Sequence, residues 1–286
     1  MMIIPINMKK IICLLLVVIS CYTTAAAQTP KRIITLGAAL TETVDALGYG
    51  KNIVAVDVTS LYPAYVNKLP RVSNNRSVSA EALIAFAPDL ILAPDGTVSK
   101  EIQYQLKSAG IRFVNVKQEF SVKGALTFVR EVAQALQAGA KGEALVKKTE
   151  SNINEALAKV KTGKKLPKVL FVYARGTGTM MVAGKKSSMD AIITLSGGRN
   201  AINEFENFKP YTTEALVKAN PDVILMFDFG YDSLGGLNGI LKMPGVAQTN
   251  AGKNKRIVQM DADLMVNFSV RLDQAITALN SKLAVL

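Results

Sequence analysis

The chain has 286 residues, 49% of them hydrophobic, and this length fits two domains of ordinary size. Its net charge of +12 is spread thinly and no basic stripe alternates with aromatic residues, so the charge suits an anionic small ligand or an acidic membrane surface better than nucleic acid. The sequence has no histidine, which removes the commonest general base and zinc ligand and argues against a hydrolase.

The N-terminal segment, residues 1–27, has the pattern of an export signal. Lys9 and Lys10 precede an apolar stretch, and small residues follow it. Cleavage can follow Ala27, or it can precede Cys21, where the preceding residues resemble a lipoprotein box. We therefore expect an exported, periplasmic protein that is either soluble or tethered by a lipid on Cys21.

The next part of the chain alternates short apolar runs, which predict strands, with segments of helical periodicity. Strands are predicted at 32–37, 52–58, 89–94 and 111–116, and helices at 39–50, 79–87 and 100–110. Strands that alternate with helices of this length predict parallel pairing, with helices on both faces of the sheet.

Residues 121–161 have helical periodicity without a convincing strand, which predicts one long helix or two in series. The alternation then restarts: strands are predicted at 167–173, 222–227 and within 256–264, and helices at 187–196, 212–219 and the C-terminus. The predicted fold is α/β, with two doubly wound lobes of parallel sheet flanked by helices. The lobes span 30–137 and 165–286, and a long connecting helix lies within 138–164.

One segment occurs twice, as "SAEALIAFAPDLIL" at 79–92 and "TTEALVKANPDVIL" at 212–225. In each copy a glutamate, Glu81 or Glu214, precedes a Pro-Asp pair by the same number of residues. One interpretation is that two βα units share a local pattern and place an acidic residue in the first helical turn, where the helix dipole favours it. The other is that each lobe presents one surface glutamate to a partner with two-fold symmetry.

Five segments, in this order, resemble a known family: "RIITLGAALTETVDALGYGKNIVAVDVTSLYP", "SAEALIAFAPDLILA", "VAGKKSSMDAIITLSGGRN", "FENFKPYTTEALVKANPDVIL" and "MPGVAQTNAGKNKRIVQMD". The chain resembles the periplasmic substrate-binding proteins of ABC importers for iron complexes, haem and cobalamin, and within them the hemin-binding (haem transport) branch.

This resemblance implies a class III periplasmic-binding-protein fold and a monomeric, non-enzymatic protein without a catalytic cofactor. Such a protein captures its ligand between two lobes and delivers it to an inner-membrane permease dimer with its ATPase. The resemblance also implies that Glu81 and Glu214 form salt bridges with arginines on the two permease subunits. Two charge pairs far apart would fix the orientation of docking.

The haem branch usually has a Gly-Tyr-x-Arg pattern before the first repeat, in which the tyrosine binds iron and the arginine meets a propionate. This chain has Asn74 at the tyrosine position and keeps Arg76. The expected iron ligand is therefore missing at this position.

Three tyrosines lie at or after the ends of predicted strands, at the edge where open α/β sheets bind ligands: Tyr62, Tyr173 and Tyr231. Tyrosinate is an accepted haem ligand, and we take Tyr62 or Tyr231 as the candidate for the iron. Arg175 and Arg76 are candidates for anionic groups of the ligand, because a guanidinium pairs bidentately with a carboxylate. The alternative is that the tyrosines are only walls of the cleft and the arginines form surface ion pairs.

Haem is thus the expected transported ligand, and a ferric siderophore or cobalamin is the alternative. Two other classes remain open at this point. An enzyme with the same doubly wound lobes is disfavoured by the missing histidine and by the lack of a complete phosphate-binding motif. A haem-scavenging surface lipoprotein without a permease would be distinguished by the absence of a neighbouring permease gene.

Overall fold

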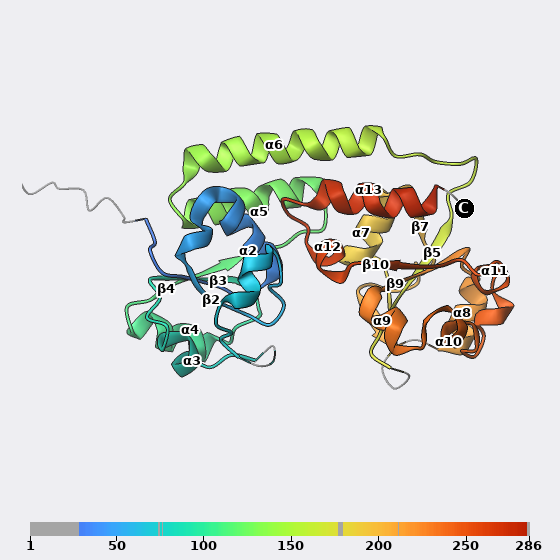
Figure 1. Cartoon of the computed structure of the whole chain (residues 1–286), viewed down its shortest axis with the longest axis horizontal. Helices are drawn as coiled ribbons and strands as arrows, with labels where there is room; N and C mark the ends of the chain where they lie inside the picture. The colour runs from blue at the N-terminus through green and yellow to red at the C-terminus, as the bar shows by residue number, and fades with distance from the viewer. Residues whose placement is uncertain (1–28, 74, 76, 177–179, 211, 285–286) are drawn as a thin grey trace, which may run out of the picture.

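A computed structural model of the chain describes residues 29–73, 75, 77–176, 180–210 and 212–284 (Figure 1). Two α/β lobes lie side by side, and helix α6 (Gly139–Ala158) runs along one side of both (Figure 1). The predicted export signal lies outside the described residues. Within the described ranges, no helix is long and apolar enough to cross a membrane.

The sheet of the N-terminal lobe is entirely parallel, as predicted, with the strand order β2-β1-β3-β4. Its strands are β1 (Ile33–Thr35), β2 (Ile53–Val56), β3 (Leu90–Pro94) and β4 (Arg112–Val116). Its helices are α2 (Ala38–Val44), α3 (Ala80–Ile84), α4 (Lys100–Ser108) and α5 (Val122–Ala135). The side chains of β1 are fully buried, because a parallel sheet is covered by helices on both faces.

The sheet of the C-terminal lobe is mixed, with the order β10-β9-β5-β6-β8. The three predicted strands pair in parallel: β5 (Lys168–Ala174), β9 (Val223–Phe227) and β10 (Ile257–Met260). Two strands that the sequence did not predict pair antiparallel beyond them, β6 (Met180–Ala183) and β8 (Phe208–Pro210), and the two-residue β7 (Arg199–Asn200) pairs with β5. These strands are two to four residues long and β8 is exposed, so they carry little periodic signal.

Seven α-helices lie in this lobe within the described residues. They are α7 (Ser188–Leu195), α8 (Thr213–Ala219), α9 (Asp228–Ser233), α10 (Gly236–Leu241), α11 (Asn250–Lys253), α12 (Ala262–Val266) and α13 (Leu272–Leu283). The largest buried cluster of the lobe includes the central Phe171 and the inner face of α13. The predicted fold class, two α/β lobes with a helical connection, is therefore confirmed, with a mixed rather than a purely parallel second sheet.

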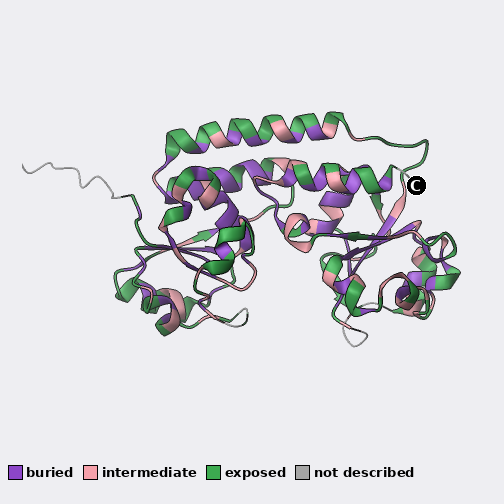
Figure 2. Cartoon of the chain, viewed as in Figure 1, coloured by how far each residue is buried: buried purple, intermediate pink, exposed green. Residues whose placement is uncertain are grey.

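The helical segment between the sheets forms two helices in series, α5 and α6. Helix α6 packs against α5 on the N-terminal side and against α13 of the second lobe. Gly142 permits the close approach to α5, because a Cβ at this position would lie 2.4 Å from the Cβ of Ala133. The outward face of α6 is exposed along its length (Figure 2). A helix that contacts helices of both lobes restricts how far the lobes can move apart.

The repeated segment forms the same local structure in both lobes. Ser79 caps α3 by accepting a hydrogen bond from the Ala82 amide at 3.2 Å, and Thr212 caps α8 through the amide of Ala215 at 3.1 Å. Each helix is followed by a residue with positive φ directly before the proline, Ala87 at 45° and Asn220 at 40°. The chain leaves the helical conformation there because a proline disfavours αR in the residue before it.

The aspartate of each Pro-Asp pair accepts hydrogen bonds from the backbone at the start of the neighbouring strand. The carboxylate of Asp89 accepts hydrogen bonds from the amides of Lys31 (2.7 Å) and Arg32 (3.1 Å), just before β1. The carboxylate of Asp222 accepts from the amide of Lys168 at the start of β5, at 2.9 Å. The two segments therefore share tertiary contacts as well as sequence.

Candidate functional site

The main candidate site is a cavity of about 650 Å³ between the two lobes, a volume typical of small-molecule sites. The N-terminal lobe contributes residues that follow β2, and the C-terminal lobe contributes the carboxyl ends of β5, β9 and β10 with the residues after them. The lining residues are Val58, Thr59, Leu61, Asn75, Tyr173, Arg175, Phe227, Asp228, Phe229, Asp261, Ala262, Asp263 and Val266. Ligands of open α/β sheets bind at this edge of the sheet.

A second cavity of about 380 Å³ adjoins the first and shares Thr59 and Val266 with it. Gly37 after β1 and Pro94 at the end of β3 line this cavity from the N-terminal lobe, and Asn267 lines it from the C-terminal lobe. The two cavities together form the interlobe cleft. The cleft therefore extends along the carboxyl edge of the N-terminal sheet.

One wall of the cleft is an aromatic cluster with an arginine. The ring of Tyr173 makes edge contacts with Phe227 and Phe229, at centroid distances of 6.3 and 5.7 Å. The guanidinium of Arg175 lies 4.9 Å from the ring centre of Phe229, and its Nε donates a hydrogen bond to the Tyr173 hydroxyl at 2.7 Å. Adjacent strands β5 and β9 bring these residues together. The wall offers apolar rings, a phenol oxygen and a positive charge.

Three carboxylates lie on the same side of the cleft: Asp228, Asp261 and Asp263. Asp261 caps α12 by accepting from the amide of Leu264 at 2.7 Å. Burial raises the pKa of Asp263, and the nearby charges of Asp261 and Asp228 raise it further, against the opposing effect of Arg271. Within the described residues no three histidine, cysteine, aspartate or glutamate side chains are grouped to hold a metal ion.

A buried polar network connects the lobes beside the cleft. Glu42 of α2 is 2% exposed and accepts hydrogen bonds from Arg271 and Asn267, which belong to the C-terminal lobe. The guanidinium of Arg271 also lies 4.0 Å from the ring centre of Tyr62. No local pattern in the sequence identifies these three polar residues as a group, because Glu42 and Arg271 are 229 positions apart.

The structure brings only some of the predicted ligand residues together. Tyr173 and Arg175 line the larger cavity. Tyr62 is 46% exposed and follows the lining residue Leu61. Tyr231 lies in helix α9, directly after β9, and packs against a core cluster of its lobe, so it is not among the described residues of the cleft lining. Asn74 and Arg76 lie outside the described residues.

The two repeated glutamates occupy equivalent exposed positions, each the second residue of its helix. Hydrogen bonding to the backbone amide of Glu81 itself and to the Ser79 hydroxyl lowers the pKa of Glu81, which is therefore ionised near neutral pH. Helices α3 and α8 lie on the side of the two lobes away from α6 (Figure 1). The glutamates can therefore face a common partner on that side.

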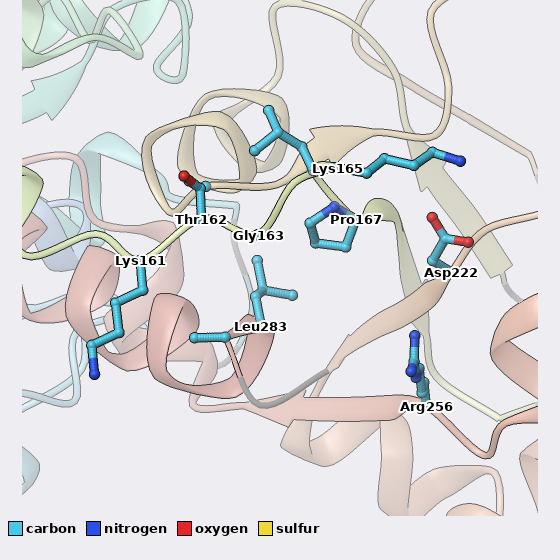
Figure 3. A pocket seen from close by; sticks show the side chains of 11 residues that line it. Lys161, Thr162, Gly163, Lys165, Pro167, Asp222, Arg256 and Leu283 are labelled. Carbon is cyan, nitrogen blue, oxygen red and sulfur yellow. The ribbon is translucent and has the colours of Figure 1, made fainter.

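A third cavity, of about 280 Å³, lies where the linker after α6 meets the end of α13. Lys165, Asp222 and Arg256 line it, and Figure 3 shows their side chains on the same side of the cavity. Lys161 lines it as well, but its side chain points away from the other charged groups (Figure 3). Asp222 accepts a hydrogen bond from the Lys168 amide at the start of β5. Because this carboxylate stabilises the fold, we do not take the cavity as the ligand site.

The family model described as periplasmic binding protein matches residues 33–264. The chain belongs to the periplasmic binding protein family. A substrate-binding lipoprotein of an ABC transporter from Bacillus subtilis, YvrC, is 30% identical over 253 residues, 87% of this chain and 79% of that protein. The chain is thus a substrate-binding protein of ABC importers, which work with permease and ATPase components, and it is not an enzyme. A periplasmic or other extracytoplasmic location fits this family.

A vitamin B12-binding protein from Vibrio parahaemolyticus is 26% identical over 223 residues, 76% of this chain and 78% of that protein. Among solved structures, the periplasmic heme-binding protein RhuT from Roseiflexus sp. RS-1, in apo form, has a TM-score of 0.84 and 34% identity, and covers 89% of this chain and 98% of its own. The periplasmic binding protein fold is thus shown, while the named ligands of similar proteins differ.

Two further heme-binding proteins share this fold. BhuT, solved in complex with two hemes, has a TM-score of 0.85 and 36% identity, with coverage of 89% and 98%. HmuT has a TM-score of 0.82 and 27% identity, with coverage of 90% and 85%. Solved variants of HmuT replace, one at a time, a tyrosine and an arginine two positions further along the chain.

Proposed function

We propose that this periplasmic binding protein captures haem in the interlobe cleft and delivers it to the permease of an ABC importer. The observation that carries the proposal is the pair of Tyr173 and Arg175, joined by a 2.7 Å hydrogen bond on an aromatic wall of the cleft. The similarity to heme-binding proteins, at 34% and 36% identity, supports haem over B12, for which the relative named above is 26% identical.

Each part of this wall suits a feature of haem. A tyrosinate oxygen is an established ligand of haem iron, and Arg175 is placed to balance the negative charge of a bound tyrosinate. The guanidinium has two nitrogens besides Nε, and these can donate to a propionate carboxylate. Phe227 and Phe229 provide apolar rings against which a porphyrin can pack.

The spacing of Tyr173 and Arg175 supports the same assignment. HmuT carries a tyrosine and an arginine with this spacing, and both were chosen for replacement in its solved variants. In this chain Tyr173 is near the end of strand β5, which ends at Ala174, and Arg175 is the first residue after the strand. We therefore infer that Tyr173, rather than Tyr62 or Tyr231, meets the iron.

A corrinoid is the second candidate, and the carboxylates of Asp228, Asp261 and Asp263 favour it. A corrinoid such as vitamin B12 carries amide side chains whose N–H groups can donate to carboxylates. The two propionates of haem would instead be repelled by these three residues, except where Arg175 compensates. A ferric siderophore remains a further alternative within the same importer family.

We infer that Glu81 and Glu214 dock the protein to the permease. Their equivalent placement in α3 and α8, the exposure of both side chains and the ionised state of Glu81 support this role. Charges at the rim of an interface act mainly on the association rate and on orientation. A monomeric binding protein with one glutamate on each lobe matches a permease dimer with two-fold symmetry.

We also propose a division of the chain into two lobes, a connecting helix and an export signal. We assign residues 30–137 and 165–286 to the lobes and 138–164 to the connecting helix, within which α6 lies. Residues 1–27 act as the export signal, and cleavage before Cys21 would make the protein a lipoprotein. Mass spectrometry of the mature N-terminus distinguishes cleavage before Cys21 from cleavage after Ala27.

The proposal is tested by titrating the purified mature protein with ferric haem and recording its absorption spectrum. Parallel titrations use Tyr62→Phe, Tyr173→Phe and Tyr231→Phe. We expect a saturable spectrum with tyrosinate character that Tyr173→Phe alone abolishes. A spectrum without saturation would refute haem binding, and the same titration with vitamin B12 and ferric siderophores would then identify the ligand class.

A further inference from the structure

Glu42 is a buried carboxylate whose described hydrogen-bond partners all come from the other lobe. Its Oε2 accepts from Nε of Arg271 at 2.8 Å, and its Oε1 accepts from the side-chain amide of Asn267 at 2.9 Å and from a terminal nitrogen of Arg271. Asn267 is 3% exposed. Glu42, Asn267 and Arg271 therefore form a polar contact between the two lobes.

A buried charge is costly unless a partner compensates it. Burial raises the pKa of Glu42, and the hydrogen bonds and charge of Arg271 oppose this rise. Burial alone would lower the pKa of Arg271, but its hydrogen bond to Glu42 and the charge of that carboxylate raise it overall. Because each group depends on the other, moving the lobes apart at this point would leave two uncompensated charges.

The guanidinium of Arg271 makes two different contacts. Its nitrogens donate to Glu42, and its central carbon lies over the ring of Tyr62, 4.0 Å from the ring centre. Tyr62 is 46% exposed and sits beside Leu61, which lines the larger cavity. A cation over an aromatic face attracts the ring electrostatically. Arg271 thus links the buried network to an exposed ring beside the ligand cavity.

The same network reaches both parts of the cleft through Asn267. This residue lines the smaller cavity, and its amide also donates to the backbone carbonyl of Asp263 at 2.8 Å. Asp263 lines the larger cavity. A change at Glu42 would therefore affect the cleft from several sides, although Glu42 itself does not line either cavity.

We propose that Arg271 is a positioning residue of the ligand site: held by Glu42 across the lobes, it fixes the ring of Tyr62 beside the cleft. The inference rests on the proposed function in so far as the cleft is the ligand site. Arg271 acts through Tyr62, so the expected effect of its loss is a moved ring and a weaker complex.

The test uses fluorine NMR of the apo protein labelled with 3-fluorotyrosine. The resonance that Tyr62→Phe removes is assigned to Tyr62. We expect this resonance to shift in Glu42→Gln, which has no direct contact with the ring, and in Arg271→Lys, which keeps the charge but loses the planar face. The double variant Glu42→Met/Arg271→Met provides a folded background if a single change destabilises the protein, because replacing both partners of a buried ion pair is often tolerated.

Arg32→Lys is the matched control, because its guanidinium donates to the carbonyls of Phe86 and Ala87 within one lobe. The Tyr62 resonance should not move in this control. Haem or vitamin B12, whichever the wild type binds, should bind about tenfold more weakly to Glu42→Gln, and this change should add little further loss to Tyr62→Ala, which already lacks the ring.

An unmoved Tyr62 resonance in all three network variants would overturn the proposal. A moved resonance with unchanged affinity would overturn it as well, because the network would then only stabilise the fold. The NMR measurement needs no ligand. A wild type that binds neither haem, vitamin B12 nor a ferric siderophore would refute the proposed function, and this result is distinguishable from a failure of the positioning role.

Discussion

Helices α3 and α8 begin with the same capping interaction and the same exposed glutamate, while the cleft walls of their two lobes have little in common. Glu81 and Glu214 follow Ser79 and Thr212 caps of nearly equal length. On the cleft side, the N-terminal lobe contributes small and aliphatic residues such as Val58 and Thr59. The C-terminal lobe contributes aromatic rings, Arg175 and three carboxylates.

This difference separates two roles. The equivalent outer features suit a partner with two-fold symmetry, and the unequal walls suit a ligand whose chemistry is recognised mainly by one lobe. The mixed sheet contributes to this asymmetry, because the antiparallel pair of β5 and β6 continues to Ala174, immediately before Arg175. Four predictions test whether the outer features and the cleft walls have these separate roles.

Tyr173→Phe should weaken haem binding by about 100-fold or more, because the change removes the oxygen that is proposed to bind iron. Tyr231→Phe is the matched control, since this tyrosine packs against the core of the same lobe. Absorption titrations measure both. Equal losses in the two variants would contradict a specific role for Tyr173.

Asp222→Ala should lower the free energy of unfolding by about 1–2 kcal/mol, because it removes a charged acceptor from the Lys168 amide and from the Asn250 side chain. Asp89→Ala should destabilise the protein in the same direction through Lys31 and Arg32. Urea unfolding monitored by circular dichroism measures both changes. If only one variant were destabilised, the repeats would not be structurally equivalent.

Glu81→Ala and Glu214→Ala should each weaken docking to the permease–ATPase complex in nanodiscs by about fivefold, with unchanged ligand affinity. Lys substitutions should weaken docking further, because they reverse the charge. Glu101→Ala is the control, since Glu101 is also an exposed residue in a first helical turn, in α4. A loss for one glutamate only would show that the two lobes dock differently.

Asp263→Asn should bind haem about twofold to threefold more tightly than the wild type at neutral pH, because the change removes a negative charge that repels the propionates. This difference should shrink as the pH falls toward the raised pKa of Asp263, where the wild-type carboxyl is itself protonated. Absorption titrations measure the ratio of the two affinities, because protonation of the Tyr173 tyrosinate weakens haem binding in both proteins as the pH falls. A wild type that binds more tightly than Asp263→Asn at neutral pH would indicate a ligand that uses the ionised carboxylate.

Local patterns in the sequence were sufficient to predict the repeated units. Their caps and prolines act within a few residues, so the exposure of Glu81 and Glu214 follows from adjacent positions. The contact of Glu42 with Arg271 could not be predicted, because it depends on how the lobes meet. The choice among the tyrosines also rests on the structure: the sequence shows only that Tyr231 follows a strand, whereas the structure places it in helix α9, against the core of its lobe.

Competition between ferric haem and vitamin B12 for the wild-type protein tests whether the interlobe cleft is a haem site. Equilibrium dialysis with each ligand alone, and then with both, measures which one occupies the cleft. We predict that haem binds saturably and that excess vitamin B12 does not displace it. Saturable binding of vitamin B12 without binding of haem would contradict the account and assign the acidic wall of the C-terminal lobe to a corrinoid.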